Sequence, residues 1–342
     1  MFKLICTNEQ GNFIDFTDES KYVITSVDGL NPPESEIIID SMPNFDGGLY
    51  RGSKMTTRNI VITFRIKNPA ERNRLDAYRV FKSKRYIKVN VTTNALDVYI
   101  EGYVESISCN NFELGQKMQV SIICPDPYFK NVTEKITNFN VDVPTLEFPF
   151  YTIDGEPVAF NTTIGDTTDG RVVIYNNGDS ETGMTITAKI KQDAPDNKMI
   201  KNLMIKNVET GEFIFIARLA TKKLDEYLLI KTEKGEKGIY AISKDPNTQE
   251  TVTINVVQDS IIDSWLTLVP GENVFEITLD ILPEGWTTYN AGGDASTKII
   301  PSGHDTIDDD IYYNSDYYRN QANVQLSQLE VVIEAHEKWQ GV

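Results

Sequence analysis

Few side chains in this sequence have the chemistry that enzymes commonly use. The 342 residues include two histidines, His304 and His336, and three cysteines, Cys6, Cys109 and Cys124. A Ser-His-Asp triad or a histidine-rich metal centre would have to be built around one of these two histidines. The cysteines are odd in number and far apart, so they match neither a disulfide framework nor the Cys-x-x-Cys spacing of a zinc site. We expect buried, apolar cysteines, no cofactor, no metal site and no enzyme.

Two further sets of side chains, both between residues 281 and 320, could bind a ligand. Asp305 and Asp308 to Asp310 could offer oxygens to calcium, but they lack the spacing and the distal Glu of an EF-hand loop, so we interpret them as solvated charge. The aromatic side chains could stack on a sugar ring, anchor a protein partner or pack against their own domain. These candidate contact residues are Trp286, Tyr289, Tyr312, Tyr313, Tyr317 and Tyr318.

A pair of catalytic carboxylates is a weaker possibility. Glycosidases need two carboxyl groups that face each other across a cleft. An acid-rich chain always contains candidates, here for example Glu276 and Glu334. Residue type alone does not bring them together, so catalysis is not expected.

The net charge of −17 is shared unevenly along the chain. Residues 1–135 contain 17 basic and 17 acidic side chains, whereas the remainder contains 16 and 33. The acidic part would repel a phosphate backbone. Residues 51–88 carry twelve basic and two acidic side chains. Helix and strand periods scatter these over several faces, which favours solvated surface and ion pairs between subunits over contact with passing DNA.

Alternating hydrophobicity predicts that the first part of the chain is mainly β-structure. Residues 60–66, 87–91 and 118–124 each place apolar side chains at every second position, as half-buried antiparallel strands do. Two prolines within residues 125–129 then end the last of these strands.

One segment of the first part has a helical pattern instead. Asn68 can act as an N-cap, and Pro69 suits the first helical position. Leu75, Tyr78 and Phe81, together with Ala77, follow at helical spacing and form an apolar stripe. The sequence therefore predicts one helix over residues 69–83, packed through this stripe on a sheet.

The second part again predicts strands and turns. Residues 203–208 and 212–217 flank one hairpin turn, and residues 227–231 and 238–242 flank another. We expect a connection over about 131–148, an antiparallel β-sandwich over 146–342, and a final strand that returns to this sandwich. Residues 281–320 are too long and irregular for an ordinary connection, so we interpret them as an excursion from the sandwich.

No apolar run approaches the ~20 residues that a membrane helix needs, and the first residues lack the apolar region of a signal peptide. We therefore expect a soluble protein that is made in a cytosol and does not insert into a membrane.

The order of these features resembles the distal tail proteins (Dit) of tailed bacteriophages and related phage-tail-like particles. In the first region the likeness rests on the strand with Val27-Asp28-Gly29-Leu30, the turn Phe45-Asp46-Gly47-Gly48, and the strand that runs into Cys124-Pro125-Asp126-Pro127-Tyr128-Phe129. The second region is similar to the galectin-like sandwich of many members, through Leu268-Val269-Pro270-Gly271-Glu272-Asn273 and the closing Lys338-Trp339-Gln340-Gly341-Val342.

This resemblance implies a mainly-β chain with a ring-forming domain at 1–135, β-sandwich-like with one α-helix, followed by a galectin-like domain at 146–342. It also implies a virion protein of a siphophage-type tail tip, made in the host cytoplasm. Six copies would form a ring that joins the tail tube protein to the tail-associated hub or lysin protein, with an axial channel for DNA. The excursion would lie on the outside, where a receptor-binding protein could dock. The alternative is a lectin-like adhesion protein that recognises a host glycan.

Overall fold

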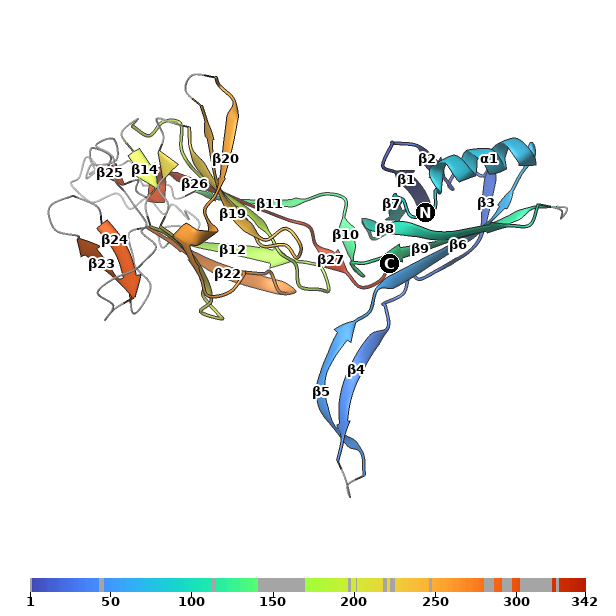
Figure 1. Ribbon diagram of the computed structural model, residues 1–342, viewed down its shortest axis with the longest axis horizontal. Coiled ribbons are helices and arrows are strands. Elements are labelled where there is room, and N and C mark those ends of the chain that lie inside the picture. The colour runs from blue at the N-terminus through green and yellow to red at the C-terminus, as the bar shows by residue number, and fades with distance from the viewer. Residues whose placement is uncertain are drawn as a thin grey trace, which may run out of the picture. The chain divides into compact units, whose positions relative to one another are not determined.

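The chain divides into two compact units in the computed structural model (Figure 1), and each is described by itself. The first unit contains residues 1–134, 178–180 and 336–342, and the second contains residues 135–177 and 181–335. The residues that the structure describes are 2–42, 46–111, 115–140, 170–195, 198–200, 202–217, 220–221, 225–245, 248–279, 286–290, 297–301, 322–323 and 326–342.

These units differ from the domains expected from the sequence in three segments. Residues 135–140 form a strand of the second unit rather than part of a connection. Residues 336–342, which we expected to return to the sandwich, belong to the first unit, because their strand pairs with a strand at 129–131. Residues 178–180 belong to the first unit as well, and Ser180 forms a β-bridge with Lys338. Apart from these three residues, the second unit is inserted between two strands of the first.

One nine-stranded sheet forms the body of the first unit, in the order β2-β1-β7-β8-β9-β6-β3, with β10 pairing β8 and β27. A separate two-stranded sheet pairs β4 with β5. The strands are β1 (Lys3–Asn8), β2 (Phe13–Asp15), β3 (Tyr22–Asp28), β4 (Ser35–Ser41), β5 (Gly48–Met55), β6 (Arg58–Ile66), β7 (Tyr86–Thr92), β8 (Asp97–Cys109), β9 (Lys117–Cys124), β10 (Phe129–Asn131) and β27 (Lys338–Trp339).

The core of the first unit lies on one face of this sheet. Strand β6 alternates strictly, with Ile60, Ile62 and Phe64 buried, as its period of two predicts. The same holds for β7 and β9, so the predicted strands are confirmed. The rings of Phe16 and Tyr22 meet Phe64 edge-on, which joins the loop after β2 to strands β3 and β6 near the other end of the sheet.

Helix α1 (Ala70–Val80) confirms the predicted helix and most of its contact face, but not its predicted start. Pro69 is the N-cap rather than the first helical residue, and no side chain caps the helix there. Of the expected stripe, Ala77 and Phe81 are fully buried and Tyr78 packs against the core, whereas Leu75 is 49% exposed. The other buried helical positions are Asn73 and Val80. The helix lies over the sheet beside β1, β2 and β6 (Figure 1).

Two antiparallel sheets enclose the core of the second unit. The six-stranded sheet has the order β11-β26-β13-β18-β19-β20, and the five-stranded sheet has the order β12-β22-β15-β16-β21. The strands of these sheets are β11 (Lys135–Asn140), β12 (Arg171–Asn176), β13 (Thr185–Ile190), β15 (Leu203–Asn207), β16 (Phe213–Ile216), β18 (Tyr227–Lys231), β19 (Gly238–Lys244), β20 (Thr251–Asn255), β21 (Ser260–Ile262), β22 (Gly271–Thr278) and β26 (Leu329–Ala335).

Both predicted hairpins of the second unit are present, as the pairs β15/β16 and β18/β19. Buried side chains from both sheets, such as Ile230 and Phe275, form one apolar cluster. The remaining short elements are β14 (Lys198–Ile200), β17 (Ala220–Thr221), β23 (Trp286–Asn290), β24 (Thr297–Pro301), β25 (Ala322–Asn323), η2 (Val257–Asp259) and η3 (Leu326–Gln328). The mainly-β fold class is confirmed.

Within the described part of the chain, no helix has the length and apolar character to cross a bilayer. The cysteines are free thiols; Cys6 and Cys124 are buried, as expected, and Cys109 is half-buried.

Candidate assembly surface

The hairpin of β4 and β5 stands apart from the main sheet of its unit (Figure 1). All seven residues of β4 are exposed. A two-stranded ribbon is at best marginally stable in water unless something packs against it. This hairpin is therefore the part of the first unit that most needs a partner.

One face of the hairpin is apolar. Ile37 and Ile39 point to this face, and Tyr50 lies directly opposite Ile39 in the register of the two strands. Their exposed fractions are 57%, 60% and 61%. The hydroxyl of Tyr50 donates to Ser53 Oγ at 3.0 Å, which holds the ring along the ribbon. We call the surface of Ile37, Ile39, Tyr50 and Ser53 the apolar hairpin face.

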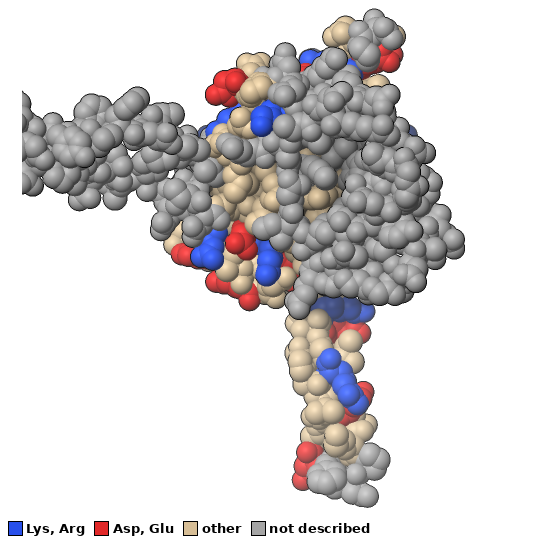
Figure 2. All heavy atoms as spheres, turned by 90° about the vertical axis from the view of Figure 1, so that its left-hand side faces the viewer, with Lys and Arg blue, Asp and Glu red and all other residues tan. Residues whose placement is uncertain are grey.

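The opposite face of the hairpin is charged. Lys54 pairs with Glu36 at 3.0 Å, and Arg51 pairs with Asp40 at 2.6 Å, on either side of Ile38. In Figure 2 basic and acidic side chains lie beside one another along this projection. Exposed pairs of this kind add little stability. They do place charged groups on this face, beside the exposed Ile38 and Leu49, whereas within 35–41 and 48–55 the face of Ile37, Ile39 and Tyr50 carries no charged side chain.

A β-bulge creates this two-sided character. The register shifts between Ile38 and Ile39, so that Gly52 pairs with Ile38 but Tyr50 pairs with Ile39. The extra residue is Arg51, whose side chain reaches Asp40 on the charged face. Without the bulge, Ile39 would lie opposite Arg51 and the apolar face would be interrupted.

The basic segment 51–88 is dispersed, as the strand and helix periods predict. Arg79 pairs with Asp76 within the helix, and Arg85, just before β7, pairs with Glu9 in the turn after β1. Arg58 differs from the others, because it is buried. Its position in phase with the buried residues of β6 was the signal in the sequence that could have revealed this.

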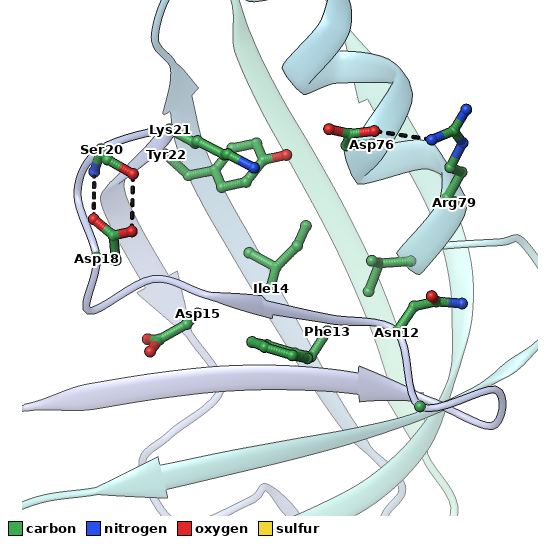
Figure 3. Close-up of a pocket in the computed structure, with 12 residues that line it drawn as sticks. Asn12, Phe13, Ile14, Asp15, Asp18, Ser20, Lys21, Tyr22, Asp76 and Arg79 are labelled. Atoms are coloured by element: carbon green, nitrogen blue, oxygen red, sulfur yellow. Dashed lines mark hydrogen bonds and ion pairs between the residues drawn. The ribbon is translucent and has the colours of Figure 1, made fainter.

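A hollow lies beside helix α1 in the first unit (Figure 3). It has a volume of about 550 Å³ and lies between β2, the loop that follows it and the last turns of the helix. Its charged groups are largely occupied: Asp18 accepts hydrogen bonds from the backbone and hydroxyl of Ser20, and Asp76 pairs with Arg79. The hollow thus has room for a small ligand but provides few free polar groups to bind one.

The aromatic residues predicted to contact a partner are described only in part. Trp286 and Tyr289 belong to β23, which pairs with β24. Tyr312, Tyr313, Tyr317 and Tyr318, like the acidic run at 305–310, lie outside the described residues. Their grouping stays a prediction.

The carboxylates considered for catalysis are not brought together. Glu276 lies on β22 and Glu334 on β26, which belong to different sheets of the second unit. In both strands the neighbouring residues are buried in the shared core, so each glutamate lies on the outer side of its own sheet. They cannot face each other across a cleft. Among the described residues, no group of three or more His, Cys, Asp or Glu side chains is placed to hold a metal.

Comparison with known proteins gives a match at the level of structure alone. No family model and no curated protein matches the sequence. The crystal structure of the Dit protein of phage SPP1 superposes with a TM-score of 0.57 at 10% identity, covering 99% of both chains. This chain has the Dit fold. Two structures of the phage P2 baseplate in its activated conformation, with Ca and with Sr, give TM-scores of 0.43 at 12% and 14% identity, covering 82% and 81% of this chain and 100% and 98% of those chains.

The likeness to the Dit fold includes both units described above. The SPP1 protein is described as a hub of the adsorption apparatus in phages that infect Gram-positive hosts. The match extends over the inserted second unit as well as the first, because it covers almost the whole of both chains.

Proposed function

We propose that this chain is a non-catalytic structural protein of a phage tail tip. Copies of its first unit assemble into a hexameric ring in the virion. This ring joins the tail tube protein to the tail-associated hub or lysin protein and leaves an axial channel for DNA. The Dit fold supports this role, and the apolar hairpin face is the observation that carries it.

The argument from the hairpin is physical. The side chains of Ile37, Ile39 and Tyr50 are exposed together on a narrow ribbon whose other face is charged. Large apolar side chains that gather on one exposed face mark a surface that another protein covers. In a ring, each subunit meets its neighbours through two different surfaces. A projecting ribbon suits such head-to-tail contact.

The assembly can be tested with two variants that differ only in the face they change. Ile39→Lys places a charge on the apolar hairpin face, whereas Ile38→Lys places it between Glu36 and Asp40 on the charged face. Mass measurement by light scattering, alone and after mixing with tail tube and hub proteins, should show loss of the ring for Ile39→Lys only. Both variants should unfold at the same denaturant concentration, since both sites are exposed.

Two results would contradict the proposal. A wild-type chain that stays monomeric both alone and with its partner proteins does not form a ring. Equal assembly of the Ile39→Lys and Ile38→Lys variants would remove the hairpin from the interface.

We further propose that the second unit serves as an outward docking or adhesion surface, with Trp286, Tyr289, Tyr312, Tyr313, Tyr317 and Tyr318 as contacts for a receptor-binding protein. Six aromatic side chains in one segment favour a binding role, because such residues are enriched at protein interfaces. Replacing residues 285–318 by a short Gly/Ser bridge should leave the ring intact and weaken adsorption to cells. Loss of the ring would place this segment in the assembly interface instead.

A further inference from the structure

Asn131 is a centre of the hydrogen bonds that hold residues 336–339 within the first unit. Asn131 uses four groups for this purpose. Its backbone N–H donates to the carbonyl of Glu337 at 3.0 Å, and its side-chain amide donates to the Glu337 carboxylate at 2.7 Å. Its side-chain oxygen accepts from the indole N–H of Trp339 at 2.9 Å, and its backbone carbonyl lies 2.9 Å from Nδ1 of His336.

His336 faces a hydrogen-bond acceptor at both ring nitrogens. Nδ1 contacts the Asn131 carbonyl, and Nε2 lies 3.0 Å from Oε1 of Glu134. A neutral imidazole has one N–H and one lone pair, so it can donate to only one of these oxygens. The imidazolium donates to both. Both acceptor oxygens therefore receive a hydrogen bond from the ring only when His336 is protonated.

We propose that His336 and Glu134 form a proton-sensitive fastener that joins the first and the last segment of the first unit. Residue 134 ends the first of these segments and residue 336 begins the last, and residues 178–180 form a third segment between them in the sequence. Protonation of His336 adds a charge-assisted hydrogen bond that closes this junction. Deprotonation turns the Nε2 lone pair toward the Glu134 carboxylate, and the junction loosens.

The sign of the pH dependence follows from the groups around the ring. The Tyr99 ring meets His336 edge-on at 5.8 Å, and the Lys88 ammonium lies over the Tyr99 ring. Four other charged groups on the elements packed there interact with partners other than His336. Lys130 pairs with Asp126, and the Asp97 carboxylate accepts a hydrogen bond from Thr92. The Glu337 carboxylate accepts from Asn131, and the Lys338 ammonium lies near the Tyr128 ring. Glu134 is thus the carboxylate that contacts the imidazole, and acid should tighten the fastener while base releases it.

Hydrogen exchange on the full chain tests this proposal. The amides to follow are those of Asn131 and Val342, which donate to the carbonyls of Glu337 and Leu30. After correction for the intrinsic exchange rate, their protection should be about two- to five-fold higher at about pH 5.5 than at about pH 8, the range in which histidine titrates and the size expected for a half-exposed ion pair.

Two substitutions and one control separate the fastener from other causes. His336→Gln should abolish the pH dependence. Glu134→Gln should abolish it as well, because the new amide can donate to the neutral imidazole and keeps the junction closed at high pH. His304→Gln removes the other histidine and should leave the wild-type ratio. The proposal is overturned if wild-type protection is the same at both pH values, or if either junction variant keeps the wild-type ratio.

Discussion

The guanidinium of Arg58 donates a hydrogen bond to the backbone carbonyl of Gln340, 282 residues further along the chain. The same side chain donates to the carbonyls of Gly29, Asn31 and Pro127. A buried cation is tolerated only when its donors are satisfied, and here four carbonyls from three parts of the chain meet that need. Burial accordingly lowers the pKa of Arg58.

Arg58→Lys should destabilise the first unit by about 2 to 4 kcal/mol. One ammonium cannot reproduce the planar set of donors, so buried carbonyls lose their partners. Urea denaturation measures the loss. Arg65→Lys, an exposed change on the same strand, is the control and should cost less than ~0.5 kcal/mol. Equal midpoints for the two variants would show that the four hydrogen bonds contribute nothing.

Phe81→Ala should cost about 3 to 5 kcal/mol, since it removes a fully buried ring and leaves a cavity beside Phe64. Leu75→Ala, in the exposed part of the same helix, should cost less than ~0.5 kcal/mol. Thermal unfolding of both variants measures the difference. A large loss for Leu75→Ala would restore the helix face expected from the sequence.

Tyr22 should make the first unit sensitive to alkali. Burial, with a smaller contribution from Asp76, raises the pKa of Tyr22 to about 12, and its hydroxyl donates to the carbonyl of Asn73 at 2.8 Å. Because the pKa is raised on folding, this phenol contributes stability that is complete below about pH 10 and is lost as the pH rises toward 12. Tyr22→Phe should lose about 1 kcal/mol at neutral pH and decline less steeply above pH ~10. Parallel declines of variant and wild type would contradict this assignment.

The three thiols should react at different rates in the native protein. Burial raises the pKa of Cys6 and raises that of Cys124 to about 12, so little thiolate is present at neutral pH. Cys109 is only half-buried, although burial raises its pKa as well. Alkylation followed by peptide mass spectrometry should modify Cys109 first and the other two only after unfolding. Modification of Cys6 in the folded chain at the rate of Cys109 would contradict the burial of β1.

The strands were predictable because burial of one face makes apolar residues recur at every second position of the sequence. Ile60, Ile62 and Phe64 alternate with residues that face away from the core, and the structure buries the three as expected. Leu75 was wrongly assigned to the core, because helical spacing gives the period of a helix but not the centre of its buried side. The other members of the stripe were correctly placed: Ala77 and Phe81 are buried and Tyr78 packs against the core.

The apolar hairpin face and the attachment of residues 336–342 to the main sheet were harder to predict from the sequence. The apolar hairpin face depends on a bulge at Arg51, and a register shift of this kind is not visible in residue types. Trp339 pairs with Phe129, 210 positions earlier in the sequence, and β27, with two residues, is too short to show a hydrophobic period. Arg58 lies two residues before Ile60, on the same face of β6, and this spacing indicates burial, but its charge suggested a solvated residue.

The route of the chain has a consequence for synthesis in the cell. Residues 336–342 leave the ribosome after the whole second unit, and they supply the carbonyl that Arg58 binds and the strand that pairs with β10. Domains generally fold as their residues emerge, at ~5–20 residues per second. The second unit can therefore fold first, while the first unit waits for residues 336–342. A prematurely terminated chain would lack this closure, so that translation itself would keep incomplete copies out of an assembly.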